Sequence, residues 1–291
     1  IVIVRKYILP EIFDKMGLKD VIEFSDEVIV YLIERFTYEP GVRKLKELLF
    51  EIIGEINLQI LKEEKDDMIL PFNVTAQDIK LKFLKERHEI RHKEIPKEPC
   101  IGTINGLWAN ALGKGGIIPI ETNFFYSPGF LDLKLTGMQG DVMQESMNVA
   151  KTLSCNLSTN AKMKSLINST KISKLQGIHI HCPEGAVPKD GPSAGTAITV
   201  AIYSLLNKKK IKNTIAITGE INLQGQVTAI GGLDLKILGG IQAGVTEFIY
   251  PKENQKDFDQ FMEKFSEKPE LKNITFHPVE HINDVLKLVF V

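Results

Sequence analysis

The sequence has few of the features that mark secreted, membrane or metal-knuckle proteins. Three cysteines, Cys100, Cys155 and Cys182, occur among 291 residues, and their odd number and wide spacing exclude a disulfide framework and a CxxC metal knuckle. Such cysteine usage is typical of a reducing compartment. The longest uncharged stretch, residues 191–207, is too short to span a bilayer, and the first residues lack a secretory cleavage site. We expect the chain to begin partway through a larger protein.

An excess of charge of one sign is also missing. Thirty-six Lys and Arg side chains stand against 37 Asp and Glu, for a formal charge of -1, so no global field favours nucleic acid or an anionic membrane. What is present, 43% hydrophobic and 25% charged residues, is ordinary for a globular protein. The length allows about two domains.

Residues 1–66 predict a small all-helical domain. After Ser25, a candidate N-cap, hydrophobic residues recur at helical spacing up to Phe36, and Pro40-Gly41 interrupts the pattern. A second hydrophobic stripe runs over residues 42–60, with Lys and Glu on the opposite face. Two amphipathic helices with so few strands beside them indicate a small helical bundle appended to another domain.

Residues 67–99 predict a charged linker. Thr75 and Asp78 have the spacing of a capping box that opens one more helix. The segment then becomes densely charged and ends in prolines, which is typical of a solvated helix followed by a tether.

Residues 100–291 predict an α+β domain with a mixed sheet. Short β-branched runs that favour strands lie at residues 101–108, 117–122, 131–136, 177–182, 214–218, 226–230 and 248–250. Helical patterns lie near residues 140–153, 193–206, 232–242 and 254–265. Strands and helices alternate only in part, which favours a mixed sheet over a doubly wound one. The polar segment 154–176 is expected to be a variable loop or a frayed helix.

A zinc-peptidase motif occurs in the charged segment but in an unsuitable context. Residues 88–92 read His-Glu-Ile-Arg-His, which fits the H-E-x-x-H pattern of two zinc-binding histidines and a general base. Charged neighbours surround it, and the cations among them repel a divalent metal. We therefore favour a charged linker and expect no metal site.

A second motif, Gly191-Pro-Ser193-Ala-Gly195, fits the G-x-S-x-G elbow of α/β-hydrolases. That elbow needs a strand running straight into the turn, but eight residues separate Cys182 from Gly191. What remains is a serine between small residues that opens an uncharged helix. The backbone N–H groups at such a helix start suit an oxyanion hole.

Several residues are candidate bases for this serine. Asp234 with His277 or His281 has the order of a hydrolase triad, while Lys236 has mainly small or apolar neighbours on its predicted helix face. A desolvated lysine favours its neutral form and is able to accept a proton. The residues alone leave lysine and histidine open. A P-loop is absent, because Gly113-Lys114 is followed by glycine.

The run GIHIHCPEGAVPKDGPSAG (residues 177–195) closely resembles the active-site signature of the Lon family of ATP-dependent serine proteases. The run TGEINLQGQVTAIGGLDLK (residues 218–236) resembles the second signature of that family. IGTINGLWAN and TGMQGDVMQESMNVA resemble the start of the protease domain and its first long helix, and YEPGVRKL resembles the end of the AAA+ lid. The resemblance thus extends over most of the chain.

The resemblance implies a role for each matching residue. Ser193 would be the nucleophile and Lys236 the general base of a Ser–Lys dyad, with the backbone N–H groups of Ser193 and Ala194 in the oxyanion hole. The other matches are the supporting residues Thr218, Asp190, His179 and His181 and the sensor-2 residue Arg43, which would contact nucleotide. The usual GGLKEK reads GGLDLK here, a departure that we expect to be harmless.

The resemblance also implies partners and cofactors. It implies ATP-dependent endoproteolysis of unfolded or damaged proteins by a homo-oligomer, a hexameric ring, with ATP and Mg²⁺ bound through an AAA+ large subdomain that these residues do not include. It indicates neither nucleic acid nor a membrane. A mitochondrial matrix location is favoured if the source is eukaryotic, and a cytoplasmic one otherwise. The rival hypothesis is a catalytically idle module that holds a ring together.

Overall fold

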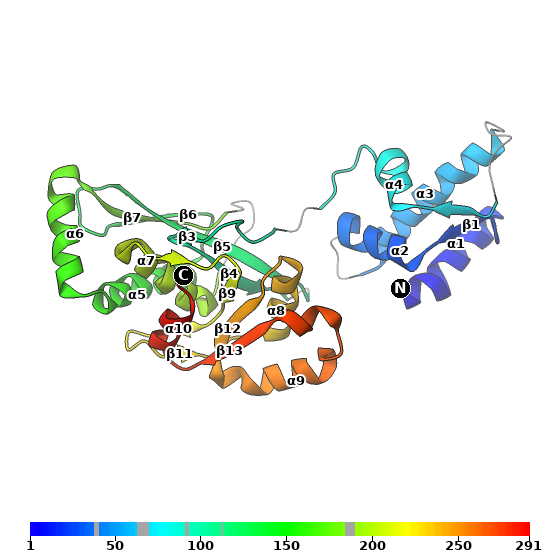
Figure 1. Cartoon of the computed structure of the whole chain (residues 1–291). Coiled ribbons are helices and arrows are strands. Elements are labelled where there is room, and N and C mark those ends of the chain that lie inside the picture. Colours follow the sequence, from blue (N-terminus) through cyan, green and yellow to red (C-terminus); the bar gives the residue numbers. More distant parts are fainter. Residues whose placement is uncertain (38–40, 63–69, 91–92, 112, 184–189) are drawn as a thin grey trace. The chain divides into compact units, whose positions relative to one another are not determined.

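The computed structural model describes residues 1–37, 41–62, 70–90, 93–111, 113–183 and 190–291. The chain divides into two compact units, Ile1–Arg91 and His92–Val291 (Figure 1). The first unit has one hydrophobic core, and the second unit has two.

The first unit is a helical bundle closed by one pair of short strands. Its elements are η1 (Val4–Ile8), α1 (Leu9–Met16), β1 (Ile22–Phe24), α2 (Asp26–Leu32), η2 (Ile33–Thr37), α3 (Arg43–Leu61), β2 (Phe72–Val74), α4 (Ala76–Asp78) and η3 (Ile79–Phe83). The predicted cap is confirmed, because Ser25 Oγ accepts the N–H of Val28 at 3.2 Å. The long helix α3 buries its predicted stripe, including Leu49, Ile52 and Ile53.

The structure corrects the predicted boundary of this unit. β2 pairs in parallel with β1, and Ile79, Phe83 and Leu84 are buried in the first core. The capping box between Thr75 and Asp78 is present as expected. Residues 70–90 therefore belong to the first unit and are not part of a linker, and the unit contains a strand pair that the all-helical prediction lacked. The prediction failed because three-residue strands leave too short a pattern to detect.

The second unit is built on a seven-stranded mixed sheet of order β13-β12-β9-β4-β5-β7-β6. Its strands are β4 (Thr103–Ala109), β5 (Gly115–Tyr126), β6 (Leu133–Thr136), β7 (Leu175–His181), β9 (Ile215–Ile217), β12 (Glu247–Pro251) and β13 (Thr275–Val279). β5 runs antiparallel to both of its neighbours, and the other pairs are parallel. The α+β class with a mixed sheet is thereby confirmed.

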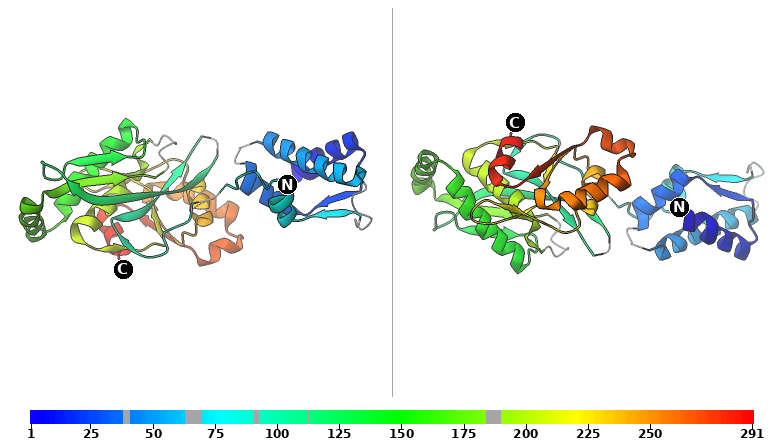
Figure 2. Two further views of the ribbon diagram at one scale, coloured as in Figure 1. Left: turned by 90° about the horizontal axis from the view of Figure 1, so that it is seen from above. Right: turned by 90° about the horizontal axis from the view of Figure 1, so that it is seen from below.

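The remaining elements of this unit are helices, short turns and small strand pairs. They are β3 (Cys100–Ile101), α5 (Asp141–Leu157), α6 (Asn160–Ser173), η4 (Pro192–Ala194), α7 (Gly195–Asn207), β8 (Lys210–Ile211), β10 (Glu220–Ile221), β11 (Val227–Thr228), α8 (Leu233–Gln242), η5 (Lys252–Asn254), α9 (Gln255–Phe265), η6 (Pro269–Asn273) and α10 (Ile282–Leu288). Of the two alternatives predicted for residues 154–176, a loop or a frayed helix, the structure favours the helix: the segment forms the end of α5, the helix α6 and the first residues of β7. Figures 1 and 2 show α6 and α9 at opposite ends of this unit.

Side chains of the central strands alternate between two cores. Along β9, Ile215 and Ile217 face the core that contains α5 and α7, while Ala216 faces the core that contains α8 and α9. Ile249 on β12 likewise faces the core that contains α5 and α7, while its two neighbours in the strand face the core that contains α8 and α9. The sheet therefore separates α7 from α8, and both faces are covered.

Candidate active site

Ser193 lies on a tight turn at the start of α7. It is the middle residue of η4, and the preceding Gly191 has φ 111°, a conformation that favours glycine. Ser193 is half-buried, whereas Ala194 and the following helix are buried. β7 ends at His181, so no strand runs directly into this turn, which agrees with the rejection of an α/β-hydrolase elbow.

The backbone of Ser193 is hydrogen-bonded to the end of β9. The carbonyl of Ser193 accepts the N–H of Gly219 at 2.8 Å and the hydroxyl of Thr218 at 3.3 Å. In return, the carbonyl of Gly219 accepts the N–H and the hydroxyl of Thr196 at 3.0 and 2.9 Å. These four bonds hold the serine turn at the carboxyl end of β9, where open α/β sheets commonly place their sites.

Lys236 reaches the same strand end from the opposite side of the sheet. Lys236, on α8, is 3% exposed, and its Nζ donates to Thr218 Oγ1 at 3.1 Å. Burial lowers the pKa of Lys236 to about 8, because desolvation disfavours the ammonium form. Lys236 is therefore a buried lysine and not a surface one, and Thr218 contacts both Lys236 and the Ser193 turn.

Close backbone contact sets the position of α8. A Cβ on Gly239 would overlap the backbone of Gly115 at the start of β5, and one on Gly115 would overlap the carbonyl of Leu235. Only glycine permits two backbones to approach this closely. This contact brings the helix against the sheet at Lys236. The small residues expected beside Lys236 on its helix face include Gly239, whereas its partner Gly115 was not predicted to take part.

Asp190 ties the residues just before Ser193 to the start of α5. One oxygen of its carboxylate accepts the N–H of Met143 at 3.0 Å and that of Gly191 at 2.9 Å. α5 has glycine, Gly140, at its N-cap, and a Cβ there would lie 2.7 Å from Asp190 Oδ2. Asp190 thus caps α5 from a distant part of the chain, in the space that the absent side chain leaves.

His179 and His181 share one hydroxyl at the edge of the sheet. Thr136 Oγ1 lies 2.9 Å from His179 Nε2 and 2.7 Å from His181 Nδ1. A hydroxyl donates one proton, so at least one imidazole donates to Thr136. Burial, with Lys134 and His181 nearby, lowers the pKa of His179. Their hydrogen bonds go to this threonine, and Thr136 itself gave no signal in the sequence.

The other predicted histidines contact other residues. His277 Nε2 is buried without a hydrogen bond to any described residue, 3.8 Å from Glu247 Oε2, and His281 contacts the carbonyl of Gln224 and the N–H of Asn283. In the zinc-peptidase motif, His88 and Glu89 lie outside any helix, and Glu89 accepts the hydroxyl of Tyr31. The other histidine of that motif lies outside the described residues.

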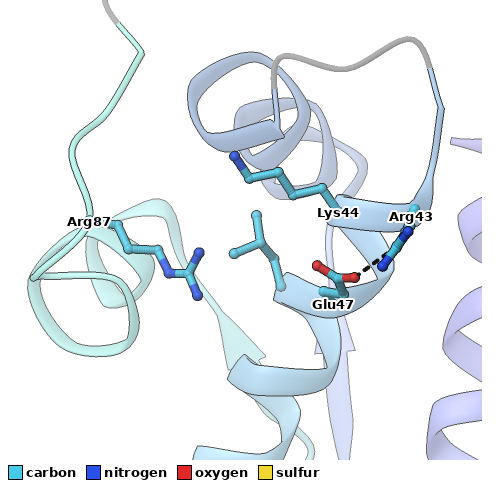
Figure 3. Close-up of a pocket in the computed structure, with 5 residues that line it drawn as sticks. Arg43, Lys44, Glu47 and Arg87 are labelled. Carbon is cyan, nitrogen blue, oxygen red and sulfur yellow. Dashed lines mark hydrogen bonds and ion pairs between the residues drawn. The ribbon is translucent and has the colours of Figure 1, made fainter.

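Arg43 lines an open hollow of about 230 Å³ in the first unit (Figure 3). The hollow is lined by Arg43, Lys44, Glu47, Leu48 and Arg87. The side chain of Arg43 is 90% exposed and pairs with Glu47 at 3.2 Å. The residue predicted to contact nucleotide, Arg43, therefore has a solvent-facing guanidinium at the first residue of α3, beside this hollow.

Comparison with known families matches both units. The profile of the Lon protease (S16) C-terminal proteolytic domain matches residues 73–291, and that of the Lon protease AAA+ ATPase lid domain matches residues 14–69. These matches, together with the α+β fold, define the second unit as a proteolytic domain of the Lon type. The chain belongs to the Lon protease family.

Curated relatives agree along nearly the whole chain. "Lon protease" from Fusobacterium nucleatum is 38% identical over 295 residues, which cover 99% of this chain and 36% of that protein. "Lon protease" from Dictyoglomus thermophilum is 36% identical over 288 residues, 98% of this chain and 34% of that protein. The chain therefore spans about a third of the length of the curated relatives it matches.

These relatives bear on the predicted location. They are bacterial, so they give no support to the predicted location in the mitochondrial matrix. In the part of the chain that the structure describes, no helix combines the length and the apolar character needed to cross a membrane.

Proposed function

We propose that this chain is the proteolytic portion of an ATP-dependent serine endopeptidase that degrades unfolded or damaged proteins. The observation that carries the proposal is the buried Lys236, which has a pKa lowered to about 8 and a hydrogen bond to Thr218 beside the Ser193 turn. A lysine in this state is able to act as a base near neutral pH, which an exposed lysine is not.

The proposed chemistry proceeds through an acyl-enzyme. Ser193 Oγ attacks the peptide carbonyl while its proton passes to Lys236 Nζ, and the backbone N–H groups of Ser193 and Ala194 stabilise the oxyanion. The carbon–nitrogen bond then breaks, and Lys236 returns the proton to the leaving amine. Water hydrolyses the ester with Lys236 again as the base. Thr218 orients the amine in each step.

Nucleotide binding and assembly are proposed for the whole protein. The exposed guanidinium of Arg43 is suited to contact a nucleotide phosphate held by an AAA+ large subdomain, with Mg²⁺ bound by residues outside this chain. ATP hydrolysis would supply unfolding and threading of the substrate. We further propose a homohexameric ring, as the family resemblance implies, with Asp190, His179 and His181 shaping the site without transferring protons.

Covalent labelling of Ser193 tests the proposal. In the assembled protein, a fluorophosphonate or a peptide boronate is expected to form an adduct at Ser193, and the adduct should be lost in Ser193→Ala and Lys236→Met. A fluorogenic peptide should be hydrolysed by the parent protein and by neither variant, while ATP hydrolysis continues in both. Peptide hydrolysis that survives in both variants, or a properly assembled ring that takes no label, would instead favour the catalytically idle module.

A further inference from the structure

Asn254, between β12 and α9, uses its side chain to hold a distant backbone segment. Its residue is 3% exposed. Its Oδ1 accepts the N–H of Ile230 at 2.9 Å, and its Nδ2 donates to the carbonyl of Ile230 at 2.8 Å and to Asp257 Oδ2 at 2.7 Å. Both amide protons are thus used. Asn254 therefore hydrogen-bonds both the N–H and the carbonyl of Ile230, as a residue of a neighbouring strand would.

The residue that Asn254 grips leads into the helix of Lys236. Ile230 is followed by Gly231 and Gly232, and Gly232 is the N-cap of α8 with φ 67° and no side chain of its own to cap the helix. Two successive glycines leave this entry to the helix with large conformational freedom. Glu253 adds a second anchor, because its Oε2 accepts the N–H of Ala229 at 2.8 Å.

The same stretch of chain also holds the hydrogen-bond partner of Lys236. The carbonyl of Ile249 on β12 accepts the N–H of Thr218 at 3.1 Å. Residues 249–254 therefore anchor Thr218 at one end and the entry to α8 at the other. The contact between Lys236 Nζ and Thr218 Oγ1 joins the two anchored segments.

We propose that Asn254 is a positioning residue for Lys236. The hydrogen bonds of Asn254 hold Ile230 in place and so determine the position at which α8 begins. This keeps the amine of Lys236 buried and in contact with Thr218. The proposal rests on the proposed function, because it assigns Asn254 to the same proton transfer. Without this anchor, α8 gains freedom at its glycine entry, water reaches the amine and the ammonium form becomes more favourable.

The test is the pH profile of peptide hydrolysis by Asn254→Ala in the assembled, full-length protein with a fluorogenic peptide. We expect kcat to fall roughly 10- to 100-fold, the cost of a small misplacement of a reacting group. KM should stay within about twofold, since Asn254 does not line the Ser193 turn. The midpoint of the rise of kcat with pH should move upward. Asn254→Asp, which keeps the size and the acceptor but loses the donors to Ile230 and to Asp257, should shift the midpoint in the same direction.

Asn207→Ala is the matched control. Asn207 Nδ2 also donates two hydrogen bonds, to Ser158 Oγ and to the carbonyl of Tyr203, at the far end of α7. Its loss should lower stability without moving the pH midpoint, so a general loss of folded protein is distinguished from a displaced lysine. An Asn254→Ala or Asn254→Asp protein with the parental midpoint, or with a rate loss that only follows its folded fraction, overturns the inference.

Parallel variants separate this inference from the proposed function. If Ser193→Ala and Lys236→Met keep peptide hydrolysis, the proposed function fails and the inference fails with it. If both lose hydrolysis while Asn254→Ala keeps the parental kcat and midpoint, only the inference about Asn254 fails.

Discussion

Thr218 Oγ1 accepts a hydrogen bond from Lys236 Nζ at 3.1 Å and donates its own proton to the carbonyl of Ser193 at 3.3 Å. One hydroxyl therefore links the helix on one side of the sheet to the turn on the other. Since its single proton is committed to Ser193, its oxygen remains an acceptor for the amine.

Replacing Thr218 with valine tests this link. Thr218→Val keeps the shape but removes the acceptor of Lys236, so the neutral amine loses its orientation. We expect kcat/KM for a fluorogenic peptide to fall about 10- to 100-fold. Thr218→Ser, which keeps the hydroxyl, should restore most of the activity, and equal loss in the two variants would contradict the hydrogen-bond explanation.

The pKa of Lys236 predicts both activity and stability as functions of pH. The base must be neutral, so log kcat/KM should rise with pH below about 8 and level off above it, as measured by peptide hydrolysis. The folded pKa lies below the unfolded value of 10.5, so between these values the unfolded chain binds a proton that the folded chain lacks. The free energy of unfolding should therefore rise with pH over this window. Below about pH 8 the amine is charged in both states, so the full cost of burying the charge lowers the stability there.

Lys236→Met isolates this cost. Methionine fills a similar volume without a charge, so we expect the variant to be more stable at pH 7, by at most about 3 kcal/mol, and to lose its activity. Denaturant unfolding of variant and parent at pH 7 and above pH 10.5 measures the difference. The gain should vanish at the higher pH, and a gain that is the same at both pH values would show that the buried charge is not its source.

The cap that Asp190 provides to α5 predicts that a substitution at Gly140 lowers both stability and the rate of labelling. Gly140→Ala introduces a Cβ into the space of the Asp190 carboxylate and should displace it from Met143 and Gly191. We expect slower labelling of Ser193 and a loss of about 1 kcal/mol in the free energy of unfolding, typical of a lost N-cap. Asp190→Ala should give a similar loss, while Asp190→Asn, which keeps an acceptor, should be milder.

The contact of α8 with β5 predicts a strong effect of one methyl group. Gly239→Ala forces α8 away from Gly115, so we expect a destabilisation of more than about 2 kcal/mol and loss of peptide hydrolysis. Gly231→Ala is the control, because a Cβ at Gly231 has no atom within 4 Å. Thermal unfolding and peptide hydrolysis of both variants decide the matter, and a well-folded, active Gly239→Ala protein would contradict the close packing.

Much of the fold was predictable because its pattern is local. The stripe on α3 and the helices α5, α7, α8 and α9 follow hydrophobic periods that are long enough to read. The strand pair β1–β2 was not, because its two strands are three residues each and lie 47 residues apart. α6 was predicted only as a loop or a frayed helix, because its sequence is polar and weakly patterned.

The candidate site was predictable in its residue types, supporting residues included, but not in most of the contacts that hold them in place. The small residues around Ser193 and the uncharged face of Lys236 are visible in the sequence. The cap from Asp190 to α5, the shared hydroxyl of Thr136 and the grip of Asn254 on Ile230 each join residues far apart in the chain. No local spacing reports such contacts, and only the folded chain brings them together.

The parallel pairing of β1 with β2 has a practical consequence for dissecting the protein. A fragment cut at residue 66 would keep β1 but lose β2 and the buried side chains of Ile79 and Phe83. It would therefore have an unpaired strand edge and an uncovered part of the hydrophobic core of the first unit. Such a fragment should aggregate, whereas one that continues through Ile90 retains every described segment of the bundle and should stay soluble.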